Sequence, residues 1–514
     1  MKPLTTSVYT FSQLRDHGFL YVDKTAKIYE LVEPGIGQYF LARPRRFGKS
    51  LLISTLKSIF LGQRELFDGL AIGDTDYDWQ TYPVLHLNLG TAVGADVEET
   101  KTALMEVISE QAQENGIELS HALLASRFRE LIQKMADNGP VVILIDEYDK
   151  PLLAHVGEEA ATGVHKLLKL FYSAIKDTAP YQRFVLLTGV SKFSRVSVFS
   201  DLNNLTDLTM SRSAATLLGY THDELVANFP DYIERLAEAQ NASVEETLQN
   251  LREWYNGYRF HQDGEPVYNP VSVMKCLQEQ EFQNFWFETG NPTFLLDALK
   301  RRPVDMDELT VPEIAFSTYE PDNLHPLPLL LQTGYLTIKD ARRIGRRREY
   351  TLDYPNYEIE ESFSAWIAQG FSNLSQQELN SALHKMVGAL RQSRVDDMLE
   401  HLKVFFSGVP NTITLDHEKY YQTIFFTVFK LIGTIIEAET STNIGRIDAI
   451  IKTESDIFIF EFKLHDTAQD ALEQILQKEY AAPYRDDPRP ITLVGAAFDP
   501  ETRNLAEWRT ESAQ

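Results

Sequence analysis

The chain has 514 residues, a length that predicts two or three domains rather than one hydrophobic core. Hydrophobic residues make up 43% and charged residues 24% of the sequence, as in ordinary globular proteins. The net charge of −25 argues against a general polyanion-binding protein, so any contact with nucleic acid needs local groups of Lys and Arg.

The single cysteine, Cys276, excludes an internal disulfide and a zinc site built on several thiols, and it favours a reducing compartment. The first residues lack an apolar stretch behind a basic start, so we expect no signal peptide. No apolar run approaches the roughly 20 residues that a membrane helix needs. These features predict a cytoplasmic protein without a membrane partner.

The first half of the chain alternates apolar strand-like runs with amphipathic helical stretches, a pattern typical of a parallel α/β sheet. Strands are expected at residues 38–42, 84–88, 141–145 and 184–188, and the longest helices at residues 97–113 and 121–137. We expect this α/β unit to occupy residues 1–259.

Two further units are expected after it. Residues 260–374 combine short helical pieces with a hairpin-like stretch at 335–340 and 349–353, which predicts a small helical, winged-helix-like module. Residues 375–514 predict an α/β domain in the order helix, three strands, helix, strand. Its elements are expected at residues 417–431, 435–440, 446–452, 457–463, 468–480 and 491–498.

A phosphate-binding loop is predicted between the strand at 38–42 and the apolar helix that follows it. Gly48, Lys49 and Ser50 supply a helix N-terminus, a lysine for the β- and γ-phosphates and a hydroxyl for Mg²⁺. The first glycine of the usual spacing would fall on Arg43. The alternative interpretation is a basic strand-to-helix turn.

An acidic pair follows the buried strand at 141–145. Asp146 is expected to hold Mg²⁺ through water, and Glu147 to polarise the attacking water. The alternative is a pair that caps a helix. Thr188 ends the next strand and is a candidate sensor of the γ-phosphate, while Arg195 is either a charge-neutralising finger or a solvated side chain.

The chain resembles the bacterial AAA-ATPase-like proteins fused to a PD-(D/E)XK nuclease domain. The resemblance covers nearly the whole chain and is carried by residues 21–25 (YVDKT), 43–50 (RPRRFGKS), 144–149 (LIDEYD), 199–204 (FSDLNN) and 254–258 (WYNGY). It implies that the missing first glycine is shared by the family and that residues 21–25 lie near the nucleotide; otherwise they form an N-terminal strand. The expected fold class is multidomain α/β, with a P-loop NTPase parallel sheet, a helical, winged-helix-like middle module and a C-terminal PD-(D/E)XK, restriction-endonuclease-like α/β domain.

A second charged site is predicted within residues 445–463. Asp448 lies in one predicted strand and Glu461 and Lys463 in the next, where the last two share a face because they are two residues apart. Pairing of the strands brings the carboxylates of Asp448 and Glu461 together, where they can hold Mg²⁺ or Mn²⁺. Lys463 would orient the attacking water or stabilise developing charge. The alternative is a hairpin with an exposed, salt-bridged face.

Other residues are expected to complete this site. Glu418 is the candidate third metal ligand, since it lies where the first helix of the fold that the chain resembles supplies a glutamate, with Glu437 and Glu439 as rivals. Gln474 and Tyr480 match the family's Gln followed by Tyr, which implies that they support the site rather than cut.

These motifs predict an ATP-dependent or ATP-regulated, metal-dependent nuclease that hydrolyses phosphodiester bonds in nucleic acid, with DNA as the favoured substrate. We expect ATP binding to open, close or assemble the particle, a homo-oligomer being one such form. A role in bacterial defence or DNA processing rests on analogy alone. Two alternatives are a nucleotide switch that binds DNA without cutting and an NTP-dependent protein-assembly scaffold.

A group of five arginines is the candidate contact with phosphates. It lies in the predicted turn between 340 and 349, where Gly345 would let the chain reverse. Arginine offers bidentate donors to phosphate oxygens at any pH. The alternative is a solvated loop whose charge nearby carboxylates neutralise. The five residues are Arg342, Arg343, Arg346, Arg347 and Arg348.

Overall fold

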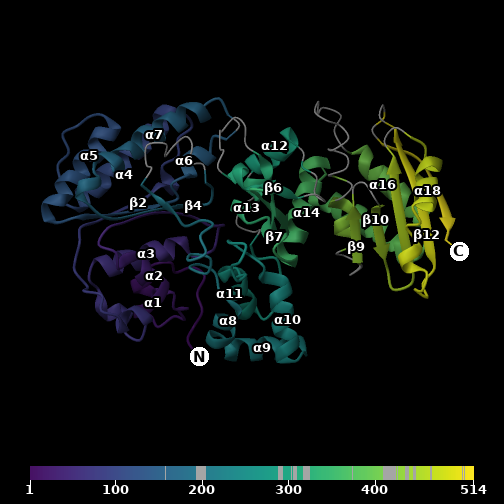
Figure 1. Ribbon diagram of the computed structural model, residues 1–514, viewed down its shortest axis with the longest axis horizontal. Helices are drawn as coiled ribbons and strands as arrows, with labels where there is room; N and C mark the ends of the chain where they lie inside the picture. The colour runs from purple at the N-terminus through teal and green to yellow at the C-terminus, as the bar shows by residue number, and fades with distance from the viewer. Residues whose placement is uncertain are drawn as a thin grey trace. The chain divides into compact units, whose positions relative to one another are not determined.

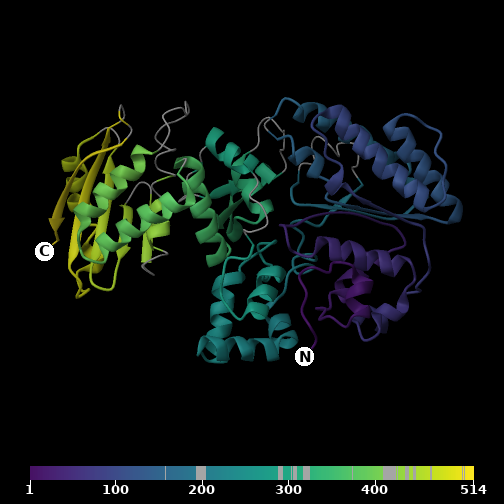
Figure 2. The same cartoon turned by 180° about the vertical axis from the view of Figure 1, so that it is seen from behind.

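The computed structural model describes residues 1–156, 158–192, 204–286, 293–302, 304, 309–316, 325–372, 374–408, 424, 427–433, 439–443, 447–463, 466–499, 502 and 504–513. The chain folds into two compact units (Figures 1 and 2). The first comprises Met1–Phe294 and Thr310–Ile359, and the second Leu295–Leu309 and Glu360–Gln514. The division at 1–259, 260–374 and 375–514 stays a prediction.

A five-stranded parallel sheet forms the centre of the first unit. Its order is β2-β3-β4-β1-β5, and every pairing is parallel. The strands are β1 (Gly37–Ala42), β2 (Val84–Asn88), β3 (Val141–Asp146), β4 (Gln182–Gly189) and β5 (Thr206–Asp207). All residues of β3 and β4 are buried, as expected for central strands covered on both faces. The four strands predicted from the sequence are confirmed, and the two-residue β5 is additional.

Helices cover both faces of this sheet, with α4, α5 and α7 on one face and α1, α2 and α3 on the other (Figures 1 and 2). The helices are α1 (Phe11–Asp16), α2 (Thr25–Val32), α3 (Lys49–Phe60), α4 (Val97–Glu114), α5 (Leu124–Met135), α6 (Lys150–Leu153) and α7 (Ala161–Asp177). The two long helices predicted from the sequence are therefore present. Asp96 begins α4 by accepting a hydrogen bond from the backbone N–H of Glu99.

A cluster of four helices follows the sheet in the chain. It contains α8 (His222–Asn228), α9 (Pro230–Gln240), α10 (Val244–Tyr255) and α11 (Pro270–Glu279). Its core includes Leu225, Leu251 and Cys276, and the N-terminal residues Leu4 and Val22 are buried in the same core. The start of the chain is thus packed on a cluster formed more than 200 residues later.

The predicted hairpin is present, but its strands are longer than expected. Helix α13 (Pro326–Thr333) precedes β7 (Thr337–Ile344) and β8 (Arg347–Asp353), and β6 (Thr310–Pro312) pairs with the other edge of β8. Ile344 pairs with Arg347, so only Gly345 and Arg346 form the turn. The prediction that all five arginines lie in the turn is therefore wrong: Arg342 and Arg343 lie in β7, and Arg347 and Arg348 in β8. In this ladder Arg342 lies opposite Glu349, while Arg343 lies opposite Arg348.

The second unit contains a mixed five-stranded sheet of order β13-β12-β11-β10-β9. Only β11 and β12 pair in parallel. The strands are β9 (Glu439–Asn443), β10 (Ile447–Lys452), β11 (Ile457–Lys463), β12 (Ile491–Asp499) and β13 (Asn504–Ser512). Helix α18 (Ala468–Gln477) packs on β11 and β12 (Figure 1). The other helices are α12 (Thr293–Arg301), α14 (Tyr357–Ser372), α15 (Gln376–Leu390) and α16 (Val395–Ser407). Both α12 and α14 begin within the first unit.

Two sequence predictions for this unit need comment. The strand predicted at 491–498 is not the last one, since the polar and mostly exposed β13 pairs with it. Of the helix predicted at 417–431, residues 424 and 427–431 are helical, and the remainder lies outside the described residues. None of the described helices is long and apolar enough to cross a membrane.

Cys276 should react with iodoacetamide about a thousandfold more slowly in the native protein at pH 8 than an ordinary thiol does. Its side chain is fully buried, and this burial raises the pKa of the thiol to about 12, which reduces the thiolate fraction at every lower pH. The measurement is the alkylation rate by mass spectrometry. The same chain in guanidinium chloride is the control, and equal rates in the two conditions would contradict the burial.

Candidate functional site

The loop between β1 and α3 has the backbone conformation of a phosphate cradle. Gly48 immediately precedes α3 with a φ of +89°, in the left-handed region that favours glycine. Nothing lies within 4 Å of a Cβ built on Gly48, so the backbone angle rather than space requires glycine there. The free N–H groups at the start of the 12-residue helix α3 can therefore face an anion.

Lys49 is buried at the start of this helix. Its Nζ donates hydrogen bonds to the carbonyl oxygens of Arg43 at 2.9 Å and Pro44 at 2.8 Å. Burial lowers the pKa of Lys49 to about 8, and the nearby carboxylates of Asp146 and Asp149 oppose that shift. The ammonium is therefore bound by the loop's own carbonyls.

Arg43 has a role that the sequence did not indicate. Its guanidinium is fully buried and lies over the ring of Phe260, 4.0 Å from the centroid. It donates to the carbonyl oxygens of Ala42 at 2.9 Å and of Thr209 and Ala214 at 2.8 Å each. Where the usual loop has its first glycine, this chain therefore has a side chain that ties the loop to residues 209–214.

The predicted acidic pair lies at the end of β3. The carboxylate of Asp146 accepts the backbone N–H of Glu147 at 2.9 Å. Glu147 has a φ of +52°, and its carboxylate lies beside Gly90, where an added Cβ would be only 2.5 Å from Oε2. The absence of a side chain at Gly90 thus leaves room for Glu147.

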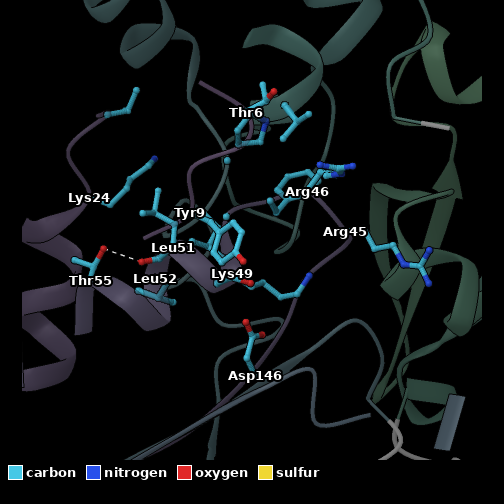
Figure 3. A pocket seen from close by; sticks show the side chains of 18 of the residues that line it. Thr6, Tyr9, Lys24, Arg45, Arg46, Lys49, Leu51, Leu52, Thr55 and Asp146 are labelled. Carbon is cyan, nitrogen blue, oxygen red and sulfur yellow. Dashed lines mark hydrogen bonds between the residues drawn. The ribbon is translucent and has the colours of Figure 1, made fainter. Parts of the chain in front are cut away.

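A cavity of about 470 Å³ joins these residues. Its polar lining includes Lys49, Ser50, Asp146 and Glu147, all predicted from the sequence. The lining also includes Tyr21, Val22 and Lys24 from the segment that the family resemblance placed near the nucleotide. The apolar lining comes from Val8, Tyr9, Leu20, Leu217, Leu218, Tyr220, Val271 and Met274. We call the part of the cavity around Lys49 and Asp146 its charged end, and the part lined by these apolar residues its apolar end. Figure 3 shows Asp146 and Thr6 on opposite sides of Lys49.

Thr188 does not reach this cavity. Its buried hydroxyl donates to the carbonyl oxygen of Leu41 at 2.8 Å, within the sheet, and Val190 lines the cavity at this strand end.

Sequence reasoning assigned no role to Asp149, which accepts bonds from the backbone N–H groups of Val190 at 3.0 Å and Ser191 at 2.7 Å. Asp149 thereby ties the end of β4 to the acidic end of β3. Arg195 lies outside the described residues.

The second unit holds a separate cluster around Glu461. Lys463 Nζ donates to Glu461 Oε1 at 3.1 Å and to Gln474 Oε1 at 2.6 Å. The amide of Gln474 also donates to Glu461 Oε1, and at 3.4 Å to the hydroxyl of Tyr480. Burial raises the pKa of Glu461, which the ion pair with Lys463 partly offsets. The structure thus brings Glu461, Lys463, Gln474 and Tyr480 together, as the sequence and the resemblance suggested.

Asp448 can be placed by backbone register. Ala449 pairs with Phe460 in the antiparallel ladder of β10 and β11. The paired positions end there, and Asp448 and Glu461 are the next residue of each strand, so both lie at the same end of the ladder. The side chain of Asp448 is not described, and only the backbone of Glu439 is described. Glu418 and Glu437 lie outside the described residues.

The donor set of this cluster suits a divalent metal ion. Glu461 Oε2 is buried and has no hydrogen-bond partner among the described residues, and a carboxylate oxygen is the hard ligand that Mg²⁺ prefers. The described residues alone hold no group of three His, Cys, Asp or Glu that could bind a metal. A complete site therefore needs Asp448 or a carboxylate beyond the described residues.

The arginines of the β7–β8 hairpin differ in their partners. Arg342 pairs with Glu349 at 3.3 Å, and Arg348 pairs with Glu313 at 3.5 Å. The exposed Arg343, Arg346 and Arg347 form no ion pair with any residue that the structure describes. These three side chains therefore carry the uncompensated positive charge of the hairpin.

Comparisons with known proteins agree with this two-site organisation. A family model described as a predicted AAA-ATPase matches residues 5–199, and one of the PD-(D/E)XK nuclease superfamily matches residues 416–508. A protein of Azotobacter chroococcum mcd 1, described as an uncharacterized protein in the vnfD 5′ region, is 34% identical over 536 residues, which cover 99% of each chain.

Two solved structures are also similar to this chain. A Walker-type ATPase of Pyrococcus abyssi gives a TM-score of 0.33 at 18% identity, over 70% of this chain and 96% of that one. An ORC2 protein of Aeropyrum pernix in ADPNP and ADP complexes gives a TM-score of 0.27 at 10% identity, over 67% of this chain and 93% of that one.

Gly495→Ala should destabilise the second unit by about 1–3 kcal/mol. An added Cβ would lie 2.4 Å from the oxygen of Ala468 and 2.6 Å from the nitrogen of Leu472, both in the backbone of α18. The helix would have to move away from β12, and Gln474 with it. The measurement is the thermal unfolding transition by calorimetry.

Gly388→Ala in α15 is the matched control for this change. Nothing lies within 4 Å of its added Cβ, and we expect stabilisation by about 0.5–1 kcal/mol because alanine favours the helix. Equal effects of the two substitutions would contradict the close approach of α18 to β12.

Proposed function

Because the chain belongs to the family of bacterial AAA-ATPase-like proteins with a C-terminal PD-(D/E)XK nuclease domain, we propose that it is an ATP-dependent or ATP-regulated, metal-dependent nuclease. The observation that carries the proposal is the presence of two separate charged sites. One surrounds Lys49 in the first unit, and the other surrounds Glu461 in the second. DNA is the proposed substrate, and defence or DNA processing is the proposed role.

The first site suits hydrolysis of a nucleoside triphosphate. The phosphates would meet the N–H groups at Gly48 and the start of α3, and Lys49 would exchange its bonds to Arg43 and Pro44 for phosphate oxygens. Ser50 and Asp146 would hold Mg²⁺, which would neutralise charge on the phosphates. Glu147 would accept a hydrogen bond from the attacking water and so polarise it.

The second site suits hydrolysis of a phosphodiester. Asp448 and Glu461, with Glu418 as the proposed third ligand, would hold Mg²⁺ or Mn²⁺, which supplies a polarised phosphoryl oxygen and a more acidic bound water. Lys463 would donate to the water or to the developing negative charge. Gln474 would hold the side chains of Lys463 and Glu461 in position, since its amide forms a hydrogen bond with each.

Glu461→Gln should reduce metal-dependent DNA cleavage by at least about a hundredfold, because a metal ligand loses its charge, and should leave ATP turnover unchanged. Glu147→Gln should keep nucleotide binding and slow ATP turnover by at least about a hundredfold. The measurement is cleavage of linear, circular and single-stranded DNA with and without ATP and Mg²⁺, together with ATP turnover of the same samples.

Glu473→Gln is the control for this experiment, because Glu473 is an exposed residue of α18 whose carboxylate accepts a hydrogen bond from Gln469 of the same helix. Normal cleavage by Glu461→Gln would contradict the nuclease site. Wild-type protein that binds DNA in response to ATP without cutting it would favour the nucleotide switch. Wild-type protein that binds no DNA at all would favour the assembly scaffold.

We propose the β7–β8 hairpin as the contact with DNA phosphates. In a protein of net charge −25, nucleic acid must be held by a local excess of positive charge. Arg343, Arg346 and Arg347 supply it, since each is exposed and each guanidinium can donate to phosphate oxygens. The exposed side chain of Ile344 lies among them, so the hairpin tip also offers one apolar contact.

Replacing Arg343, Arg346 and Arg347 together by Ala should lower the log–log salt dependence of DNA binding by a slope of about three, because each phosphate contact contributes about one. ATP turnover of the free protein should not change. The measurement is a binding isotherm at several salt concentrations. The double variant of Arg342 and Arg348 is the control, since carboxylates already neutralise both residues. An equal change in slope for the two variants would argue against the assignment.

A further inference from the structure

The apolar end of the cavity includes a segment whose carbonyl oxygens accept hydrogen bonds from one fully buried cation, Arg43, and one partly buried cation, Lys24. This wall segment, residues 214–220, follows β5 and leads into α8. Leu217, Leu218 and Tyr220 of this segment line the cavity. The carbonyl oxygen of Ala214 accepts a hydrogen bond from Arg43 at 2.8 Å, and that of Thr216 accepts one from Lys24 at 3.0 Å. Two side chains from outside the segment therefore help to hold the wall, in addition to the backbone bridge between Tyr220 and Tyr268.

Residues 23–25 hold the backbone of Lys24 firmly. Asp23 Oδ1 accepts the backbone N–H of Thr25 at 2.8 Å and its hydroxyl at 2.6 Å. Asp23 Oδ2 accepts the N–H of Ala71 at 2.7 Å, and the hydroxyl of Thr25 accepts the N–H of Ile72 at 3.0 Å. The residues on either side of Lys24 are thus anchored to the short 3₁₀ helix at Ala71–Asp74. The backbone of Lys24 is therefore fixed by its neighbours, independently of the hydrogen bonds that its side chain forms.

The ammonium of Lys24 is engaged by protein groups even though Lys24 lines the cavity. It forms an ion pair with Glu224 at 2.6 Å, in addition to the bond to Thr216. Glu224 in turn belongs to the capping box of α8, where it accepts the backbone N–H of Thr221. Burial lowers the pKa of Lys24, and the carboxylate of Glu224 opposes this shift. Lys24 thereby ties the wall segment and the start of α8 to α2.

Arg43 joins the wall to the phosphate-binding loop. Its carbonyl oxygen accepts the ammonium of Lys49 at 2.9 Å, while its guanidinium donates to the wall at Ala214. One residue thus contacts both the phosphate-binding lysine and the apolar end. Figure 3 shows Lys24 and Asp146 on opposite sides of Leu51.

We infer that Lys24, together with Arg43, positions the wall that receives the nucleobase, and that neither side chain binds the phosphates. This inference rests on the proposed nucleotide site and adds the residues that set the distance between its two ends. An apolar wall suits the flat face of a base, and the N–H groups and Lys49 suit the phosphates. Loss of Lys24 should then affect only ligands that carry a base.

The test compares ATP with inorganic tripolyphosphate, which has the phosphates but no base. Both displace a fluorescent ATP analogue from the full-length protein in Mg²⁺, and the measurement is the apparent Kd of each. Lys24→Met should weaken ATP binding about tenfold, as loss of a charge-assisted hydrogen bond predicts. Binding of tripolyphosphate should be unchanged. Lys24→Arg should restore most of the ATP affinity, because it keeps a donor for Thr216 and Glu224.

Lys27→Met in α2 is the matched control, since Lys27 does not line the cavity. This substitution should leave the apparent Kd of both ligands unchanged. Equal losses of ATP and tripolyphosphate in Lys24→Met would overturn the inference, because Lys24 would then act on the phosphates or on the fold. Unchanged binding of both ligands in Lys24→Met would overturn the inference too. So would a wild-type protein from which ATP displaces the fluorescent analogue and tripolyphosphate does not. Wild-type protein that binds neither ligand would contradict the proposed nucleotide site itself.

Discussion

The hydrogen bonds of one buried guanidinium, that of Arg43, organise the nucleotide-binding part of this protein. A charge removed from water destabilises a fold unless its donors are satisfied. Here Nη1 and Nη2 donate to three carbonyl oxygens and the ring of Phe260 covers the guanidinium, while Nε has no hydrogen-bond partner among the described residues. Because two of the three carbonyl partners lie in residues 209–214, the guanidinium links the entry to the phosphate-binding loop with the segment beyond β5. A glycine at this position would give the backbone more conformational freedom, whereas the arginine side chain attaches the loop to residues 209–214.

In both charged sites, the lysine ammonium forms hydrogen bonds with protein groups before any substrate binds. Lys49 donates to two carbonyls of its own loop, and Lys463 donates to Glu461 and Gln474. A substrate oxygen would therefore exchange one hydrogen bond for another instead of meeting a bare charge. Neither ammonium therefore lacks a protein partner when no substrate is bound. Part of the gross interaction energy is given up in the exchange, and the remainder is the net affinity.

Short-range patterns in the sequence were enough to predict most strands and several site residues. Apolar runs bounded by turns predicted β2 and β11 with their observed ends. The spacing of Glu461 and Lys463 predicted that they share a face of the strand, where the two side chains are in contact. The structure also unites Lys49, Ser50, Asp146 and Glu147 around one cavity, although their functional roles stay predictions.

The remainder depends on contacts between distant parts of the chain, which a local pattern cannot reveal. From the sequence alone, Arg43 is only a departure from the usual spacing of the phosphate-binding loop. Its role is visible once its hydrogen bonds to Thr209 and Ala214 are known. The longer β7–β8 hairpin has Arg342 paired with Glu349 across the strands and Arg343 opposite Arg348, a register that the run of arginines does not reveal. The polar strand β13 has no apolar alternation, and its position becomes clear only beside β12.

The place of β13 at one edge of its sheet has a consequence for self-association. An edge strand offers unpaired backbone groups to other chains, and charged side chains are a common defence against such pairing. The outer strand here carries Glu507, Arg509 and Glu511, while the strand that it covers is rich in buried apolar residues. A chain ending before residue 504 would expose β12 as a long apolar edge. The polar C-terminal strand thus protects the folded protein against edge-to-edge aggregation.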